Sequence, residues 1–133
     1  MAHILIADDD ALIGEVVFYA LEKNGHSVAV VDNGADVLDT ILNSRPDIVI
    51  LDNLMPGMRG IEVLEQMKIS ATTTDIPVIM LTSQTGRNHV IEAYRAGVSD
   101  YMTKPFEPES LVARIDDLIG SCVTPPALSF NLN

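Results

Sequence analysis

Short apolar runs alternate with longer amphipathic stretches over the first 120 residues of the chain. Short apolar runs bounded by polar or turn residues are typical of buried strands, whereas apolar residues three or four positions apart are typical of one helix face. The pattern predicts strands at 4–7, 28–31, 48–51, 78–81 and 101–102. It predicts helices at 11–24, 35–43, 61–68, 88–96 and 108–119.

Turn residues support these boundaries. Asp10 stands where the first helix needs an N-cap, because an aspartate carboxylate accepts hydrogen bonds from free helix amides. Gly97 stands where the fourth helix needs a terminating glycine. Pro46 ends the second helix, since the residue before a proline avoids helical geometry.

Five consecutive strand–helix units indicate an α/β fold. Continuous apolar strands that alternate with helices are typical of a parallel sheet covered by helices on both faces. Right-handed crossovers leave few topologies for such a chain. Residues 121–133 contain two prolines and no helical period, so we expect a tail or the truncated start of a linker there.

Composition narrows the functional classes. The 133 residues suit one domain, and 47% of them are apolar, which is enough for a core. A net charge of −11 offers no evident basic face for nucleic acid or an anionic membrane. One cysteine cannot form an internal disulfide, and no apolar run reaches the roughly 18 residues of a membrane span. The N-terminus lacks the pattern of a secretory signal, so we expect a cytoplasmic protein.

Polar side chains follow four of the predicted strands. Asp8 and Asp9 follow the first strand, Asp52 the third, Thr82 the fourth and Lys104 the fifth. Open α/β sheets bind ligands at the carboxyl ends of their strands, where the strand order reverses. If the first and third strands are neighbours, the three aspartates share one small site.

Three carboxylates in one site call for a cation. Two like charges about 5 Å apart repel by roughly 3 kcal/mol at an effective dielectric near 20, and three such pairs by roughly 10 kcal/mol at the upper end. One lysine cannot offset that repulsion, whereas a divalent cation can. Hard oxygen ligands without a nearby histidine or thiolate favour Mg²⁺. The sequence therefore predicts a Mg²⁺ site.

The same residues suit phosphoryl transfer. A carboxylate is a competent phosphoryl acceptor. Mg²⁺ on one side and Lys104 on the other would neutralise the negative charge of a transferring phosphoryl group, and Thr82 would donate a hydrogen bond to one of its oxygens.

Four segments of the chain resemble the signature segments of the receiver domains of two-component response regulators. These segments are ILIADDD, PDIVILDNLMPGMRG, IPVIMLTS and DYMTKPF. The resemblance runs from about Ala2 to Gly120 and implies a receiver domain over residues 1–120. It also implies a flavodoxin-like, doubly wound sheet of five parallel strands in the order 2-1-3-4-5, with helices on both faces. The periodicity by itself predicts only the parallel repeat.

The resemblance implies roles for the acidic residues. Asp52 matches the aspartate that is phosphorylated in the family. Asp9 matches the direct Mg²⁺ ligand, Asp8 a ligand that acts largely through water, and the backbone carbonyl of Leu54 the third protein ligand.

The resemblance assigns the remaining site residues as well. Thr82 matches the switch hydroxyl, Lys104 the lysine that pairs with the phosphoryl group, and Tyr101 the switch aromatic. The peptide bond before Pro105 is expected to be cis, as is usual in the family.

The implied function is that of a phosphoaccepting signalling switch rather than an enzyme acting on a separate substrate. A histidine kinase or histidine phosphotransfer protein would donate the phosphoryl group to Asp52, in a reaction that the domain itself assists, as it assists the later dephosphorylation. The surface formed by the fourth helix, fifth strand and fifth helix would then change and act on a downstream effector domain or protein. Phosphorylation-dependent pairing of two copies is a further expectation, whereas direct binding of nucleic acid or membrane by this domain is not expected.

Three other classes compete with this interpretation. A haloacid-dehalogenase-type phosphotransferase needs a second aspartate two positions after the nucleophile, where this chain has Leu54. A flavin-binding electron carrier needs a phosphate loop after the first strand, where Asp8 and Asp9 would repel a phosphate. A degenerate receiver that serves only as a docking scaffold would lack some of the signature residues.

Overall fold

The computed structural model describes residues 2–120, in which strands and helices alternate. The strands are β1 (His3–Ala7), β2 (Ser27–Val31), β3 (Ile48–Leu51), β4 (Val78–Thr82) and β5 (Asp100–Thr103). The helices are α1 (Ala11–Lys23), α2 (Gly34–Ser44), α3 (Gly60–Ile69), α4 (Arg87–Ala96) and α5 (Pro108–Gly120).

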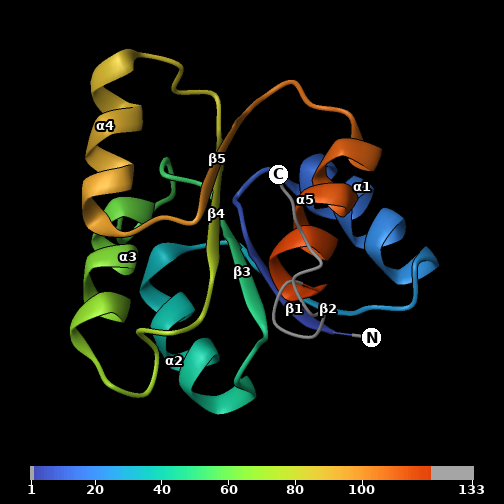
Figure 1. Cartoon of the computed structure of the whole chain (residues 1–133), viewed down its shortest axis with the longest axis horizontal. Coiled ribbons are helices and arrows are strands. Elements are labelled where there is room, and N and C mark those ends of the chain that lie inside the picture. The colour runs from blue at the N-terminus through green and yellow to red at the C-terminus, as the bar shows by residue number, and fades with distance from the viewer. Residues whose placement is uncertain (1, 121–133) are drawn as a thin grey trace, which may run out of the picture.

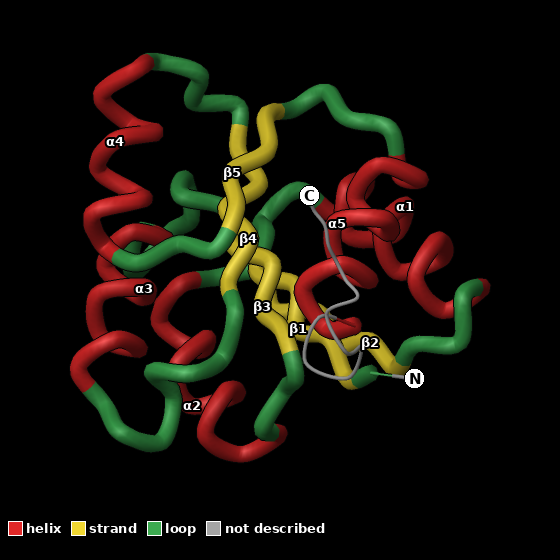
Figure 2. The backbone as a smooth tube through the Cα atoms, in the orientation of Figure 1, coloured by secondary structure: helices red, strands yellow, loops and turns green. Residues whose placement is uncertain are grey.

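The five strands form one parallel sheet in the order β2-β1-β3-β4-β5. Helices α2, α3 and α4 cover one face of this sheet, and α1 and α5 cover the other (Figures 1 and 2). This confirms the predicted doubly wound α/β fold and the strand order that the family resemblance implied. The strand order reverses between β1 and β3, so the loops after these two strands diverge to opposite sides and leave a crevice at their carboxyl ends.

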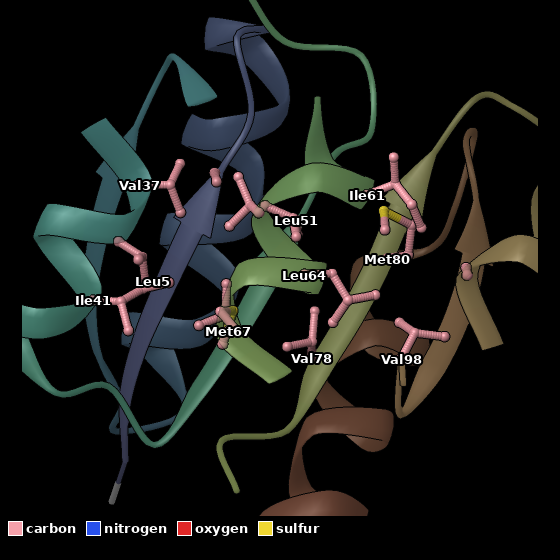
Figure 3. Close-up of a cluster of buried hydrophobic side chains, with 14 of the residues drawn as sticks. Leu5, Val37, Ile41, Leu51, Ile61, Leu64, Met67, Val78, Met80 and Val98 are labelled. Atoms are coloured by element: carbon pink, nitrogen blue, oxygen red, sulfur yellow. The ribbon is translucent and has the colours of Figure 1, made fainter. Parts of the chain in front are cut away.

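Two apolar clusters hold the helices on the sheet. Leu5, Leu51 and Met80 point from the sheet toward α2 and α3, where they meet residues such as Ile41 and Leu64 (Figure 3). On the opposite face, the sheet packs against α1 and α5 through a second cluster. Every residue of β3 and β4 is buried, because helices cover both faces of these strands.

Local signals in the sequence set the helix ends. The side chain of Asp10 accepts hydrogen bonds from the amides of Leu12 and Ile13, which confirms the predicted N-cap of α1. Gly97 ends α4 with φ of 104°, a left-handed conformation that glycine adopts without steric cost.

The boundaries of the observed strands and helices either match the predicted boundaries or differ from them by one residue. The difference that matters is at β4, which runs to Thr82 instead of ending at Leu81. Thr82 pairs with Thr103 of β5, and this pairing extends both strands beyond their apolar residues. The tail predicted for residues 121–133 lies outside the described residues.

Candidate functional site

The backbone of the sheet positions two of the predicted acidic residues. The amide of Asp8 donates to the carbonyl of Val31, and the amide of Asp52 donates to the carbonyl of Ala7, at 3.0 and 2.9 Å. The ladder of the sheet therefore continues to the first residue after β1 and after β3. Both side chains start from rigid backbone, at the point where the strand order reverses.

Asp8, Asp9 and Asp52 form an acidic cluster. One carboxylate oxygen from each residue lies within 4.8 Å of the others. Asp8 and Asp52 are buried, whereas Asp9 is exposed. Asp8 Oδ1 also accepts a hydrogen bond from the amide of Asp10 at 2.9 Å. The sequence prediction that three aspartates meet in one site is correct.

Lys104 joins the two buried carboxylates. Its Nζ lies 2.7 Å from Asp8 Oδ2 and 3.2 Å from Asp52 Oδ2. The Lys104 amide donates to the carbonyl of Thr82 at 2.9 Å, so the start of the β5–α5 loop is tied to the end of β4. The Lys104–Pro105 peptide bond is cis, as the family resemblance implied.

Burial and neighbouring charges shift the pKa values of Asp8 and Lys104. Burial raises the pKa of Asp8 above its ordinary value, and the nearby charge of Asp52 adds to the shift, although the hydrogen bonds from Lys104 and Asp10 oppose it. Burial acts to lower the pKa of Lys104, but its hydrogen bond to Asp8 and the charge of Asp52 outweigh that effect, so the pKa is raised. Burial thus favours the protonated form of Asp8, and the neighbouring carboxylates favour the protonated form of Lys104.

The turn after Asp52 is tightly packed. The amide of Leu54 donates to Asp52 Oδ1 at 3.2 Å, and the Leu54 side chain points outward and is 49% exposed. Gly60 begins α3 directly against this turn. A Cβ atom on Gly60 would lie 2.3 Å from the Asp52 carbonyl oxygen, so a glycine is required by the close approach of the two backbones.

Thr82 and Tyr101 meet through a residue that the sequence did not single out. The amide of Gln84 donates to Thr82 Oγ1 at 3.3 Å, and the Tyr101 hydroxyl donates to the Gln84 carbonyl at 2.5 Å. Thr82 is fully buried and Tyr101 is half-buried. Burial raises the pKa of Tyr101, and the charge of Asp52 contributes to the shift.

Asn53 is a second site residue that the sequence pattern did not predict. It is buried beside Asp52, and its side chain bonds to Gln84 Oε1 at 2.6 Å and accepts from the amide of Ile61 at 2.8 Å. Asn53 and Gln84 are uncharged, and neither stands directly after a strand, so the pattern of polar residues at strand ends did not single them out. Their link joins segments 31 positions apart, so only the fold reveals it.

The donor set fits a hard divalent cation. Three carboxylates and one ammonium leave two uncompensated negative charges in a partly buried cluster. The acidic cluster holds oxygen donors only, which suits Mg²⁺ better than zinc or copper.

Fold and site together define a class of protein. A five-stranded 2-1-3-4-5 sheet, with an acidic cluster at the switch point and a lysine from the last strand–helix loop, is the architecture of a receiver domain. A family model for the response regulator receiver domain matches residues 4–116. The chain belongs to this family.

Curated relatives and solved structures agree with this assignment. The chain is 40% identical over 112 residues to the phosphate regulon transcriptional regulatory protein PhoB of Pseudomonas aeruginosa, covering 84% of this chain and 49% of PhoB. It is 39% identical over 117 residues to the response regulator MprA of Mycobacterium sp. strain KMS, covering 88% of this chain and 50% of MprA. The crystal structure of a putative response regulator from Chloroflexus aurantiacus superposes with a TM-score of 0.85 at 33% identity, covering 90% of this chain and 98% of that one.

The match to the curated relatives covers only part of their length. The chain spans about half the length of the curated relatives that it matches. Among the helices of residues 2–120, none has the length and apolar character needed to cross a membrane.

Membership in the receiver family sets aside the phosphotransferase of the haloacid-dehalogenase type and the flavin carrier.

Proposed function

We propose that this domain is a phosphoaccepting switch in which Asp52 receives a phosphoryl group in a Mg²⁺-dependent reaction. The observation that carries the proposal is the position of Asp52. It is buried at the carboxyl end of the central strand β3, next to Asp8 and Asp9 and in contact with Lys104. The donor would be a phosphohistidine of a sensor kinase or of a histidine phosphotransfer protein.

In the transfer, a carboxylate oxygen of Asp52 attacks phosphorus while the bond from phosphorus to the donor imidazole nitrogen breaks. The imidazole leaves with the electron pair of that bond and needs no oxidant or reductant. Asp8, Asp9, Asp52 and the backbone carbonyl of Leu54 are the residues that we assign to Mg²⁺. When bound, Mg²⁺ supplies charge neutralisation for the phosphoryl oxygens.

Lys104 and Thr82 would complete the site. Lys104 is already held within 3.2 Å of Asp52, so it can follow the negative charge from the carboxylate to the phosphoryl oxygens. The Thr82 hydroxyl accepts a bond from the Gln84 amide, which leaves its one proton for a phosphoryl oxygen. The same groups would orient a water molecule for the later hydrolysis of the acyl phosphate.

The output surface that we propose consists of α4, β5 and α5. Ile91 and Tyr94 of α4 are 40% and 50% exposed, and Asp100 of β5 forms an ion pair with Arg114 of α5. Tyr101 lies at the edge of this surface and contacts the loop after Thr82. A change at Thr82 can therefore reach the surface through one aromatic side chain.

Partners and location belong to the same proposal. PhoB is named as a transcriptional regulatory protein, so an effector domain or a separate effector protein is the expected target of the switch. Pairing of two phosphorylated copies through α4, β5 and α5 is part of the proposal, and so is a cytoplasmic location. The domain carries a net charge of −11, which disfavours direct contact with nucleic acid.

Labelling with acetyl phosphate tests the proposal. We expect the wild-type chain to gain a phosphoryl group that hydroxylamine releases, as it releases acyl phosphates, in Mg²⁺ and none in excess chelator. Asp52→Asn should abolish the label, and Asp39→Asn, on the exposed face of α2, should retain it. A wild-type chain that stays unlabelled in Mg²⁺ would instead support the alternative of a receiver that serves only as a docking scaffold.

A further inference from the structure

Gln84 forms hydrogen bonds with three residues around the candidate site. Its amide donates to Thr82 Oγ1, and its carbonyl accepts from the Tyr101 hydroxyl. Its side-chain oxygen accepts from Asn53 Nδ2. One residue in the β4–α4 loop is therefore bonded to both proposed switch residues and to the neighbour of the proposed phosphoacceptor.

Asn53 is a rigid anchor for this link. It is 5% exposed and lies between Asp52 and Leu54. Its carbonyl accepts from the amide of Gly60, and its Oδ1 accepts from the amide of Ile61, so the first turn of α3 holds it in place. The Asn53 amide group is then oriented toward Gln84, at a short distance of 2.6 Å.

The anchor controls where the backbone of Gln84 lies. Gln84 is followed by Thr85 and Gly86, and α4 begins only at Arg87, so the loop itself supplies little rigidity. Asn53 ties the Gln84 side chain to the turn that carries Asp52. The amide and carbonyl of Gln84 are thereby held where they meet Thr82 and Tyr101.

We propose that Gln84 is a positioning residue, which through its side-chain bond to Asn53 aligns the Thr82 hydroxyl and the Tyr101 ring with the Asp52 turn. This role rests on the phosphoacceptor function proposed above. Loss of the side-chain bond frees the β4–α4 loop. Thr82 then presents its hydroxyl less often to a phosphoryl group on Asp52, and Tyr101 leaves the Gln84 carbonyl more often.

Two substitutions of similar size separate the hydrogen bond from the bulk of the side chain. Gln84→Met keeps the length of the side chain and removes the acceptor for Asn53. Gln84→Glu keeps an oxygen acceptor at the same position. We would measure the rate of labelling by acetyl phosphate in Mg²⁺ and the fluorine NMR signal of Tyr101 in protein containing 3-fluorotyrosine. The chain has three tyrosines, and Tyr101→Phe assigns the signal.

We expect Gln84→Met to lower the maximal labelling rate about fivefold, the population change that corresponds to one lost neutral hydrogen bond, with little change in KM. Its Tyr101 signal should shift toward that of a solvated ring. Gln84→Glu should keep the Tyr101 signal near that of the wild type, because the carboxylate oxygen still accepts from Asn53 Nδ2, whereas its added negative charge can change the labelling rate. Urea unfolding with the same transition midpoint as the wild type reports that each variant is folded.

The two proposals fail in different ways. A wild-type chain without label overturns the phosphoacceptor function before any variant is compared. A labelled wild type with unchanged rate and Tyr101 signal in Gln84→Met overturns the positioning role alone. An equal shift of the Tyr101 signal in Gln84→Met and Gln84→Glu also overturns it, because the acceptor oxygen would then be irrelevant.

Discussion

Lys104 Nζ lies closer to Asp8 than to Asp52, at 2.7 Å against 3.2 Å. The lysine is therefore shared between two buried carboxylates, and it does not belong to Asp52 alone. Asp8 provides a fixed partner that keeps the ammonium in the site when the charge on Asp52 changes. A phosphoryl group on Asp52 would meet a lysine that is already in place, which lowers the cost of reorganisation during transfer.

Asp9 and Asp10 offer a matched pair of substitutions, because they are adjacent and have different roles. Asp9 belongs to the acidic cluster, whereas Asp10 caps α1. We expect Asp9→Ala to weaken Mg²⁺ binding by roughly tenfold or more through the loss of one ligand charge. Asp10→Ala should lower the free energy of unfolding by about 1 kcal/mol and leave the Mg²⁺ affinity nearly unchanged.

Calorimetric titration with Mg²⁺ and urea unfolding measure these two quantities. Equal losses of Mg²⁺ affinity in the two variants would show that the acidic cluster is not the cation site.

Gly60 should be intolerant of even one added methyl group. A Cβ there would lie 2.3 Å from the Asp52 carbonyl oxygen and 2.8 Å from Asn53 Cα, so the start of α3 would have to move. We expect Gly60→Ala to lower the free energy of unfolding by about 1–3 kcal/mol, the usual cost of overpacking, and to slow labelling of Asp52.

Gly14→Ala is the control for this prediction. Its Cβ would meet only Val30 Cγ1, at 3.4 Å, and alanine favours the helix interior by up to about 1 kcal/mol. Urea unfolding of both variants should give changes of opposite sign. A Gly60→Ala variant as stable as the wild type would contradict the close packing of α3 against the Asp52 turn.

Tyr101 should ionise above the ordinary tyrosine value of 10.0, because burial and the charge of Asp52 both raise its pKa. Its neutral form is favoured by the fold. The contribution of neutral Tyr101 to the free energy of unfolding is therefore fully present below pH 10.0. It is lost as the pH rises through the pKa of Tyr101 in the folded protein. Absorbance titration near 295 nm should show a transition that Tyr101→Phe removes.

Asp52→Asn should move that transition toward lower pH, since the negative charge beside the ring is gone, while the contribution of burial remains. A Tyr101 transition that is identical in the two proteins would show that the Asp52 charge is not felt at the ring.

The sequence predicted much of this structure because its signals are local. Apolar runs such as Ile48–Leu51 are bounded by polar or turn residues, and Asp10 and Gly97 occupy helix ends where their chemistry is favoured. The strand order is not local, and here it followed only from the family resemblance. The end of β4 was placed one residue too early, because Thr82 is polar and pairing with Thr103 does not depend on hydrophobicity.

The site was predictable where chemistry forces a residue type. Asp8, Asp9 and Asp52 at strand ends indicate a cation, and Lys104 indicates a partner for negative charge. The Asn53–Gln84 bond could not be predicted, because neutral amides have many uses and the two residues meet only after the sheet has formed. That Lys104 contacts both Asp8 and Asp52 likewise became evident only from the distances in the folded structure.

The most direct measurement is the location of the phosphoryl group within the chain. After labelling with acetyl phosphate in Mg²⁺, reduction with borohydride converts an aspartyl phosphate to homoserine, which mass spectrometry locates by its altered residue mass. The account predicts homoserine at position 52 and at no other aspartate. Homoserine at position 8 or 9, or a phosphate that stays on Ser83, the residue after Thr82, during treatment with hydroxylamine, would contradict the claim that Asp52 is the phosphoacceptor.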